Sequence, residues 1–382
     1  MIVLFWILTG LLAYAYVGYP VLILLLGRVG RRRWVIDESH QPLVSFVIPA
    51  YNEEGVIAGK LDNTLALDYP AVSREILVAS ESDDGTDALV ERYAARGVRL
   101  ISSAVRLGKV ANQHRAVEQG SGEILVFTDA NAMLRRDALR KLVRRFADPR
   151  VGAVSGRLAY RVTTGIAGAY NEDLYWDFEM ILKRASSHLG SLPGANGSLY
   201  AVRRSLYRPL SETRGDDFEL PIRVILQGHA SILEPEAVSE EAPASGYRDQ
   251  FLRKVRIVNW MVVSALVLLK EAIAERRWLL AWQLLSHKLN RWAVPFWLLA
   301  LAPVSVWLAP RGGAYLAAAL LQGVIYTLAV AGLAMDRSGV RLPSVVSIPF
   351  YFVLVNAAAL VAIAARAAGR EARWHKRADG LS

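Results

Sequence analysis

The sequence predicts an α/β domain carried by membrane helices, and three observations support this fold class. Between about residues 44 and 156, short β-rich runs alternate with helix-like segments, as expected for βαβ units. Two of the apolar runs end in acidic or amide side chains, and ligands of open α/β sheets bind beyond the carboxyl ends of the strands. Outside this region, apolar runs of about 20 residues or more are long enough to cross a bilayer.

The first apolar run, Ile2–Leu26, predicts a retained membrane anchor. A cleaved signal peptide is the alternative, but no basic region precedes the run, its length exceeds a usual signal region, and basic residues follow it. These basic residues are Arg28, Arg31, Arg32 and Arg33. Because positive residues beside a span stay in the cytoplasm, we expect a multi-pass protein of the cell membrane with a cytoplasmic catalytic domain.

The α/β domain is expected over residues 43–235, where strand and helix signals alternate. Its strands are predicted at Val44–Ile48, Glu75–Ala79, Arg99–Ser102, Glu123–Phe127 and Val151–Gly156. Its helices are predicted at Gly55–Leu67, Asp87–Arg96, Lys109–Gln119 and Arg136–Phe146.

Three further apolar runs are candidate spans, near Trp292–Leu308, Ala314–Met335 and Pro343–Ala365. Three crossings would put the basic tail Arg366–Arg377 outside, whereas its charge favours the inside. Either one run is re-entrant or interfacial, or the tail breaks the charge rule. The predicted membrane parts are an anchor over residues 1–27, spans over residues 292–366 and a basic tail over residues 367–382.

Residues 236–291 are predicted to form amphipathic helices at the membrane surface. Gln250–Trp260 spaces basic residues by three, and Arg276–Trp292 mixes tryptophan with arginine and lysine. The net charge of +10 is concentrated near span ends and in Arg248–Arg256, which indicates a lipid bilayer as partner. No base-reading motif supports a nucleic acid partner. The absence of cysteine excludes disulfides, thiolate catalysis and cysteine-ligated zinc.

Three acidic motifs follow one another along the chain: VSFVIPAYNEE at Val44–Glu54, EILVFTDAN at Glu123–Asn131 and GDDFEL at Gly215–Leu220. Each has a simpler explanation as a strand end, a turn or a helix cap. In this order, however, they resemble the GT-A catalytic domain of the family 2 glycosyltransferases, inverting enzymes that use nucleotide-activated sugars. The resemblance covers roughly Leu43–Trp260 and implies a Rossmann-like mixed sheet with helices on both faces. Related enzymes include cellulose, hyaluronan and poly-N-acetylglucosamine synthases and ceramide glucosyltransferase-like enzymes.

The resemblance implies a nucleoside site after the first two strands. Tyr51 and Glu53 occupy the positions that help to hold the base and ribose in the family. Family members usually have an aspartate after the second strand, where this chain has Glu81, with Asp83 or Asp84 as alternatives. The implied donor is a UDP-sugar.

The resemblance also implies a site for the donor diphosphate and a divalent metal. Lys109 opens a helix, where an anion site is physically favoured, although a solvated lysine is the alternative. Asp129 is the expected ligand of Mg²⁺ or Mn²⁺, which prefer oxygen donors, and Asn131 replaces the usual second aspartate as a weaker ligand. Arg253 and Arg256 are the expected diphosphate contacts from the later basic segment.

On the acceptor side, the resemblance assigns Asp217 as the general base that removes the hydroxyl proton during inverting transfer. The Gly-rich turn at Gly194, Asn196 and Gly197 is expected beneath the acceptor, with Trp260 stacking against it. In polymerising relatives a tryptophan directly follows the arginine of the last motif. Here Ile257 takes that place, which favours single-sugar transfer.

The sequence therefore predicts a membrane glycosyltransferase that moves a sugar to a lipid or glycan acceptor. A processive polysaccharide synthase that extrudes its product is the alternative within the same family. A catalytically silent membrane scaffold with the same fold is the alternative from another class, and failure to bind nucleotide sugars would favour it.

Overall fold

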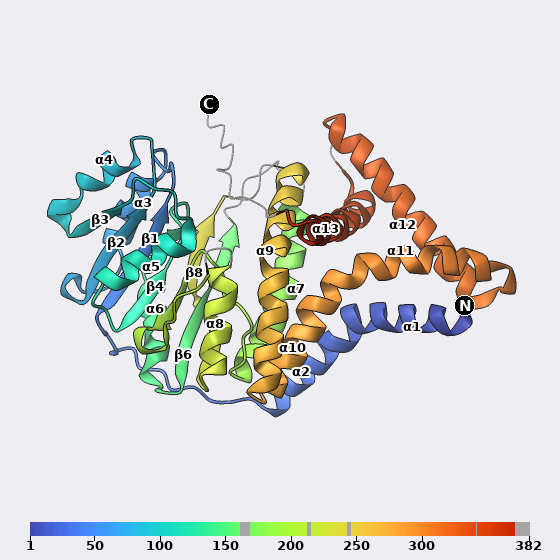
Figure 1. Cartoon of the computed structure of the whole chain (residues 1–382), viewed down its shortest axis with the longest axis horizontal. Helices are drawn as coiled ribbons and strands as arrows, with labels where there is room; N and C mark the ends of the chain where they lie inside the picture. The colour runs from blue at the N-terminus through green and yellow to red at the C-terminus, as the bar shows by residue number, and fades with distance from the viewer. Residues whose placement is uncertain (161–168, 212–214, 243–245, 341, 371–382) are drawn as a thin grey trace.

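The computed structural model describes residues 1–160, 169–211, 215–242, 246–340 and 342–370. An α/β domain with an eight-stranded sheet lies at one side, and the apolar helices extend away from it (Figure 1). The order of the strands across the sheet is β3-β2-β1-β4-β7-β6-β8-β5. The fold is therefore the predicted mixed α/β sheet with membrane-type helices. The predicted basic tail at residues 367–382 falls almost wholly outside the described residues.

Four neighbouring strands are parallel, namely β3 (Val98–Ser102), β2 (Arg74–Ser80), β1 (Val44–Ala50) and β4 (Ile124–Phe127). The strand β7 (Tyr200–Arg203) lies between β4 and β6 (Val151–Tyr160) and is antiparallel to both. Strand β6 also pairs with β8 (Ala230–Glu241), and β8 pairs with the edge strand β5 (Met133–Leu134). In the β4–β7 pair, Phe127 lies opposite Tyr200. The turn after β4 and the loop before β7 therefore meet at one edge of the sheet.

Apolar helix faces cover both sides of the sheet. On one side, α3 (Ile57–Leu65) and α4 (Thr86–Glu91) share an apolar core with alternate residues of β1 and β2, and α6 (Ala138–Val143) packs on β6 and β8. On the other side, α5 (Lys109–Gln119) packs on β1 and β2, and α8 (Asp216–Leu226) packs on β6, β7 and β8. Because both faces are buried, the central strands are continuously apolar, as in the sequence.

Each predicted strand and helix of the domain is present, with shifts at several ends. The predicted helix Asp87–Arg96 is α4 followed by the 3₁₀ turn Ala94–Arg96, which ends at Gly97 with a φ of 85°. The predicted helix Arg136–Phe146 is α6 followed by the 3₁₀ turn Arg144–Ala147. Strand β8 was not predicted, because Pro235 and several acidic residues interrupt its apolar pattern.

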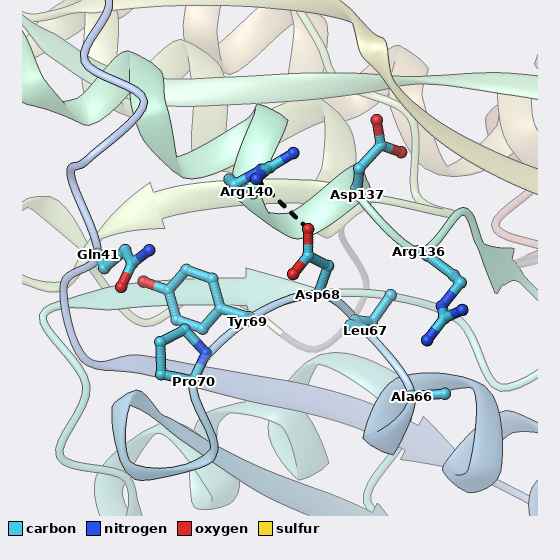
Figure 2. Close-up of a pocket in the computed structure, with 9 residues that line it drawn as sticks. All are labelled: Gln41, Ala66, Leu67, Asp68, Tyr69, Pro70, Arg136, Asp137 and Arg140. Carbon is cyan, nitrogen blue, oxygen red and sulfur yellow. Dashed lines mark ion pairs between the residues drawn. The ribbon is translucent and has the colours of Figure 1, made fainter.

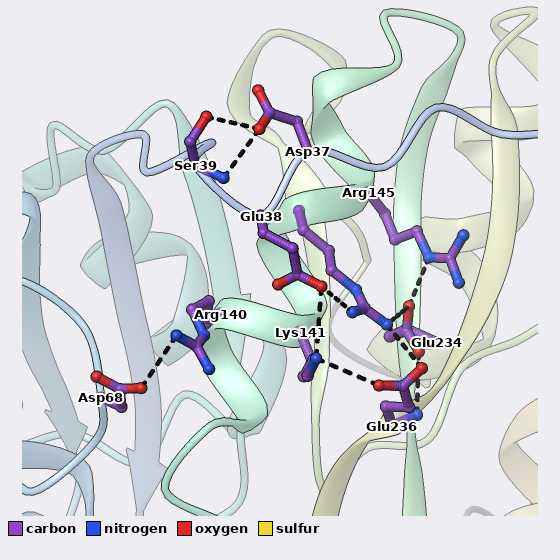
Figure 3. Close-up of polar contacts among 10 residues, drawn as sticks. Asp37, Glu38, Ser39, Asp68, Arg140, Lys141, Arg145, Glu234 and Glu236 are labelled. Atoms are coloured by element: carbon purple, nitrogen blue, oxygen red, sulfur yellow. Dashed lines mark hydrogen bonds and ion pairs between the residues drawn. The ribbon is translucent and has the colours of Figure 1, made fainter.

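Polar contacts hold the segment between the first apolar helix and β1 against the domain. Glu38, on the segment before β1, forms ion pairs with Arg144 and Lys141, and Lys141 also pairs with Glu236 at 3.3 Å (Figure 3). Glu234, which is fully buried on β8, accepts hydrogen bonds from Arg144 and Arg145 at 3.1 and 2.5 Å. These contacts explain why Glu234 and Glu236 occur on β8. They also hold the segment before β1 against the domain.

Five helices of the described chain are long and apolar enough to cross a membrane: Ile2–Val29, Tyr247–Ala274, Trp278–Arg311, Gly313–Arg337 and Ser344–Ala367. The first comprises α1 (Ile2–Ala13), a π-helical turn at Tyr14–Gly18 and α2 (Tyr19–Val29). Pro20 has no backbone N–H to donate, and π-helical turns are a common local response to such a defect. The third comprises α10 (Trp278–Gln283), a π-helical turn, α11 (Asn290–Leu308) and a 3₁₀ turn.

Helix α9 (Tyr247–Ala274) runs along the α/β domain, whereas α1 and α11 extend away from it (Figure 1). Near its end, Glu271 pairs with Arg223 of α8 at 3.5 Å, and Arg277 donates to the carbonyl of Leu226 at 3.3 Å. The second and fifth candidate spans lie together, since α13 (Ser344–Ala367) packs on α9 through Phe350, Ala359 and Ala362. Helix α12 (Gly313–Arg337) connects α11 to α13.

Candidate active site

The turn after β4 presents Asp129 to two neighbouring elements. Lys109 Nζ, at the start of α5, lies 2.9 Å from Asp129 Oδ1 and 3.3 Å from Asp216 Oδ1 at the start of α8. Burial lowers the pKa of Lys109, but Asp129 and Asp216 outweigh it, so the pKa is raised and the lysine is a cation. The structure thus brings the predicted site residues Lys109 and Asp129 together with Asp216, and we call these three residues the Asp129 cluster.

Asp216 is the anchored member of the acidic pair. It is buried and accepts hydrogen bonds from Tyr200 Oη at 2.6 Å and Gln113 Nε2 at 3.1 Å. Burial raises its pKa, but Lys109 and these donors prevail, and the pKa of Asp216 is lowered. The N-cap of α8 is Gly215, without a side-chain cap bond, so helix capping does not explain the acidic pair.

Asp217 has different surroundings from Asp216. Its side chain is half-buried, and burial followed by repulsion from Asp216 raises its pKa to about 6. A Cβ atom added at Gly197 would lie 3.2 Å from Asp217 Oδ2 and 3.5 Å from Asp129 Oδ2. The two carboxylates therefore border the same small space, which the absence of a side chain at residue 197 keeps open.

The loop with Gly194, Asn196 and Gly197 precedes β7 and reaches the site through the β4–β7 pair. Gly194 has a φ of 121°, which a side chain would strain, and Ala195 N donates to Asp217 O at 2.7 Å. Asn196 is buried, its amide donating to Gly156 O and accepting from Lys183 Nζ, both at 2.8 Å. Asn196 thus ties the Gly-rich loop to Gly156 of β6 and to Lys183.

The predicted nucleoside residues lie at the ends of β1 and β2. The Tyr51 ring lies 4.1 Å from the Arg106 guanidinium, and Glu53 N donates to Thr86 Oγ1 at 2.9 Å. Glu53 precedes α3, which begins at Ile57, and is half-buried. Tyr51 and Glu53 are therefore at the strand edge where the resemblance put them.

Glu81 is buried and bonded to the loop before α5. It accepts hydrogen bonds from Leu107 N at 2.8 Å and Gly108 N at 3.1 Å. Asp83 and Asp84 are the alternatives to Glu81 for the nucleoside contact. Asp84 accepts a hydrogen bond from Thr86 N at 2.9 Å, and Asp83 has an exposed side chain. In this structure Glu81 orients the segment that carries Lys109.

The predicted residues Arg253, Arg256 and Trp260 lie on α9, which runs along the domain (Figure 1). Arg253 donates to Tyr160 Oη, at the end of β6, over 3.4 Å. The Arg256 guanidinium lies 5.8 Å from the Trp260 ring centre, and both side chains are half-buried. Neither of these contacts, in the described part of the chain, involves Lys109, Asp129 or Asp216.

The oxygen atoms of Asp129 and Asn131 suit a divalent cation that is bound by the protein and by a diphosphate at the same time. No group of three or more histidine, aspartate or glutamate side chains able to hold a metal occurs among the described residues. Mg²⁺ and related ions, however, are often bound by one or two protein oxygens together with substrate phosphates. Asp129 is about one-third exposed, and Asn131, two residues on, is half-buried, so neither oxygen donor is shut away in the core.

Sequence reasoning missed several polar residues around the site, namely Lys60, Gln113, Lys183 and Tyr200. Burial lowers the pKa of Lys183 to about 8, while Glu179 and Asp217 oppose the shift. Lys60, Gln113 and Lys183 lie within helices, and Tyr200 begins the strand after the Gly-rich turn, so no sequence signal distinguished them from ordinary core or surface positions.

A separate pocket of about 730 Å³ lies near the segments that lead into β1 and β2 (Figure 2). Gln41, Asp68, Tyr69, Arg136 and Arg140 are among its lining residues, and Arg140 pairs with Asp68 at 3.4 Å. Asp129 and Tyr51 lie at the opposite, carboxyl ends of the parallel strands. None of the predicted site residues lines this pocket.

Residues 45–210 match the model of the family described as Glycosyl transferase family 2. The chain is similar to a poly-beta-1,6-N-acetyl-D-glucosamine synthase of Staphylococcus epidermidis, with 25% identity over 179 residues that cover 46% of this chain and 43% of that protein. It is also similar to a beta-monoglucosyldiacylglycerol synthase of Synechocystis sp., with 30% identity over 215 residues, 52% of this chain and 44% of that protein. The match thus spans less than half of the length of either relative.

A solved structure is similar over nearly the whole chain. It is a mannosyltransferase from Pyrobaculum calidifontis in complex with GDP-Man and Mn²⁺, and it is 26% identical to this chain. The superposition has a TM-score of 0.70 and covers 96% of this chain and 100% of that structure.

Proposed function

Because residues 45–210 match the model of the Glycosyl transferase family 2, we propose that this chain transfers a sugar from a nucleoside-diphosphate sugar to a membrane-presented acceptor, with inversion. The observation that carries this proposal is the small space between Asp129 and Asp217 at Gly197. One carboxylate there is positioned for a donor-bound cation and the other for an acceptor hydroxyl.

In this proposal Asp217 is the general base. The acceptor oxygen attacks the anomeric carbon from the face opposite the leaving nucleoside diphosphate, and Asp217 accepts the hydroxyl proton. A base with a pKa of about 6 is ionised at neutral pH and is still a better proton acceptor than an unperturbed aspartate. Asp216, held by Tyr200 and Gln113, stays ionised and raises the pKa of its neighbour.

Asp129 and Asn131 would hold Mg²⁺ or Mn²⁺ together with the donor diphosphate. The bound cation would neutralise the charge that develops on the departing nucleoside diphosphate. Lys109, which pairs with Asp129 in this structure, would then be released toward the diphosphate. The cluster thus provides positive charge where the leaving group needs it.

The donor nucleotide is open to a direct test. The sequence resemblance favours a UDP-sugar, whereas the similar Pyrobaculum mannosyltransferase was solved with GDP-Man. Purified protein would be incubated with labelled UDP- and GDP-sugars and a lipid extract, and lipid-linked, polymeric and free-sugar products would then be separated. Absence of donor binding and of any transfer would contradict the proposal and favour a silent scaffold.

A processive synthase is the second candidate, and the Staphylococcus similarity favours it. Two observations favour single transfer: Ile257 where polymerising relatives have tryptophan, and similarity across nearly the whole chain to a mannosyltransferase. The beta-monoglucosyldiacylglycerol synthase similarity suggests a lipid acceptor. Size-exclusion analysis of the products distinguishes the two candidates, because only a synthase yields high-mass glycan.

For the membrane arrangement, we propose three spans, formed by α1–α2, α10–α11 and α12, with α9 and α13 lying in the membrane surface. The ion pair of Glu271 on α9 with Arg223 of α8, and the bond from Arg277 just after α9 to Leu226, support the position of α9 against the cytoplasmic domain. Because α13 packs on α9 from Phe350 to Ala362, it follows the same surface. Two crossings after the domain then return the chain to the cytoplasm, in agreement with the basic charge after α13.

A further inference from the structure

Lys60, on α3, is a fully buried lysine directly behind the Asp129 turn. Its Nζ donates to Thr128 Oγ1 at 2.8 Å and to the carbonyl oxygen of Ala132 at 2.5 Å. These two acceptors flank the segment that contains Asp129 and Asn131. No carboxylate of the described residues lies within ion-pair distance of the ammonium.

Burying an amine this completely is costly, and lysine is rarely fully buried without a charged partner. A methionine of similar length would fill the same volume without that cost. The two hydrogen bonds, together with attraction to the Asp129 and Glu241 carboxylates, offset this cost. Both a charged and a neutral amine carry the two N–H groups that these bonds require.

The bonds of Lys60 belong to a longer chain of contacts. Thr128 Oγ1 accepts from Lys60 and donates to Ser198 O at 2.7 Å, and Ala132 N donates to Asp129 O at 3.2 Å. Ser198 directly follows Gly197. Lys60 thus connects α3 to the Asp129 turn and, through Thr128, to the loop that borders Asp217.

We propose that Lys60 is a positioning residue that holds the Asp129 turn in the conformation that binds the divalent cation. The inference rests on the proposed function, because it assumes a cation at Asp129. Lys60 is fully buried behind the turn, so it acts through the hydroxyl group and the backbone carbonyl on either side of the ligands. Such supporting contacts commonly determine metal affinity as strongly as the ligands' own geometry.

The test compares Lys60→Met with Leu61→Ala, a control on the same helix whose side chain is fully buried. Mn²⁺ binding is measured by the EPR signal of free Mn²⁺ in the presence of UDP or GDP, and folding is checked by thermal unfolding. We expect Lys60→Met to bind Mn²⁺ about 10-fold to 100-fold more weakly than wild type. Leu61→Ala should lose thermal stability while it keeps wild-type Mn²⁺ affinity.

A second pair of variants tests the Lys60–Thr128 hydrogen bond by changing Thr128 instead of Lys60. Thr128→Val removes the hydroxyl group at nearly constant volume, and Thr128→Ser retains it. We expect the valine variant to lose Mn²⁺ affinity and the serine variant to stay close to wild type. This pair decides the question even if Lys60→Met does not fold.

Folded Lys60→Met and Thr128→Val proteins with wild-type Mn²⁺ affinity would overturn the positioning role and leave the proposed transferase function intact. Equal loss of affinity in Leu61→Ala would also overturn it, because general destabilisation would then explain the effect. Absence of Mn²⁺ binding in the wild-type protein would instead overturn the metal site itself, and with it the role of Lys60.

Discussion

Asp217 and Asp129 face one another across Gly197, because a Cβ atom at that glycine would lie 3.2 Å from Oδ2 of one and 3.5 Å from Oδ2 of the other. The two residues come from different motifs, separated by most of the domain. The proposed proton acceptor and the proposed cation ligand therefore border the same small space.

Asp217→Asn separates binding from chemistry. The amide keeps the shape of the side chain but cannot accept a proton, so transfer should fall about 10²-fold to 10⁴-fold. Donor affinity should stay near that of wild type. Transfer rate and nucleotide binding are measured on the same folded variant, and near-normal transfer would remove Asp217 from the mechanism.

The pH dependence of transfer should report on the same group. Burial and Asp216 raise the pKa of Asp217 to about 6, and only the ionised form accepts a proton. The value of kcat/KM should therefore be at its plateau above this pKa and fall as the pH drops below about 6. A profile that stays flat down to pH 5 would contradict the assignment, with far-ultraviolet circular dichroism as the control for folding.

Removal of the metal or its ligand should abolish transfer. Excess chelator should inactivate the wild-type protein, and added Mn²⁺ or Mg²⁺ should restore it. Asp129→Ala should lose at least about 10²-fold in transfer, because the cation contributes several kcal/mol of charge stabilisation. Full activity in chelator would exclude a required divalent cation.

Gly197→Ala tests the shared space directly. The new methyl group would press on Asp217 and approach Asp129, so transfer should fall by about 10²-fold from misplacement of the reacting groups. Stability should change little, because residue 197 has no positive φ. Gly194→Ala is the contrasting variant: its φ of 121° predicts strain and a lower unfolding temperature. Unchanged transfer in Gly197→Ala would show that the space is not used.

The proposed topology can be tested with single cysteines, since the natural chain has none and gives no background labelling. A membrane-impermeant thiol reagent should label Gly312→Cys, at the α11–α12 turn, from outside the cell. Arg370→Cys, after α13, should react only in inverted vesicles, as should the exposed domain position Asp83→Cys. Labelling of Arg370→Cys from outside would instead make α13 a fourth span.

The sequence by itself determined the fold class, which the sheet confirms, and the resemblance to family 2 glycosyltransferases, which the match of residues 45–210 to that family's model bears out. It could do so because short apolar strands that alternate with helices have few alternative arrangements, and their carboxyl ends share one edge of the sheet. It also predicted that Asp129 lies at that edge, because Asp129 directly follows an apolar strand. The assigned roles of Asp129 and Asp217 remain predictions that the experiments above address.

Only the tertiary structure decided which groups meet at the site. The strands β4 and β7 are more than 70 residues apart in the sequence, and their pairing brings Gly197 beside Asp129. Long-range packing also engages Glu81 with the loop before α5 and places Lys60 behind the turn. Such contacts depend on where side chains distant in sequence come together, and local patterns of hydrophobicity and charge do not contain that information.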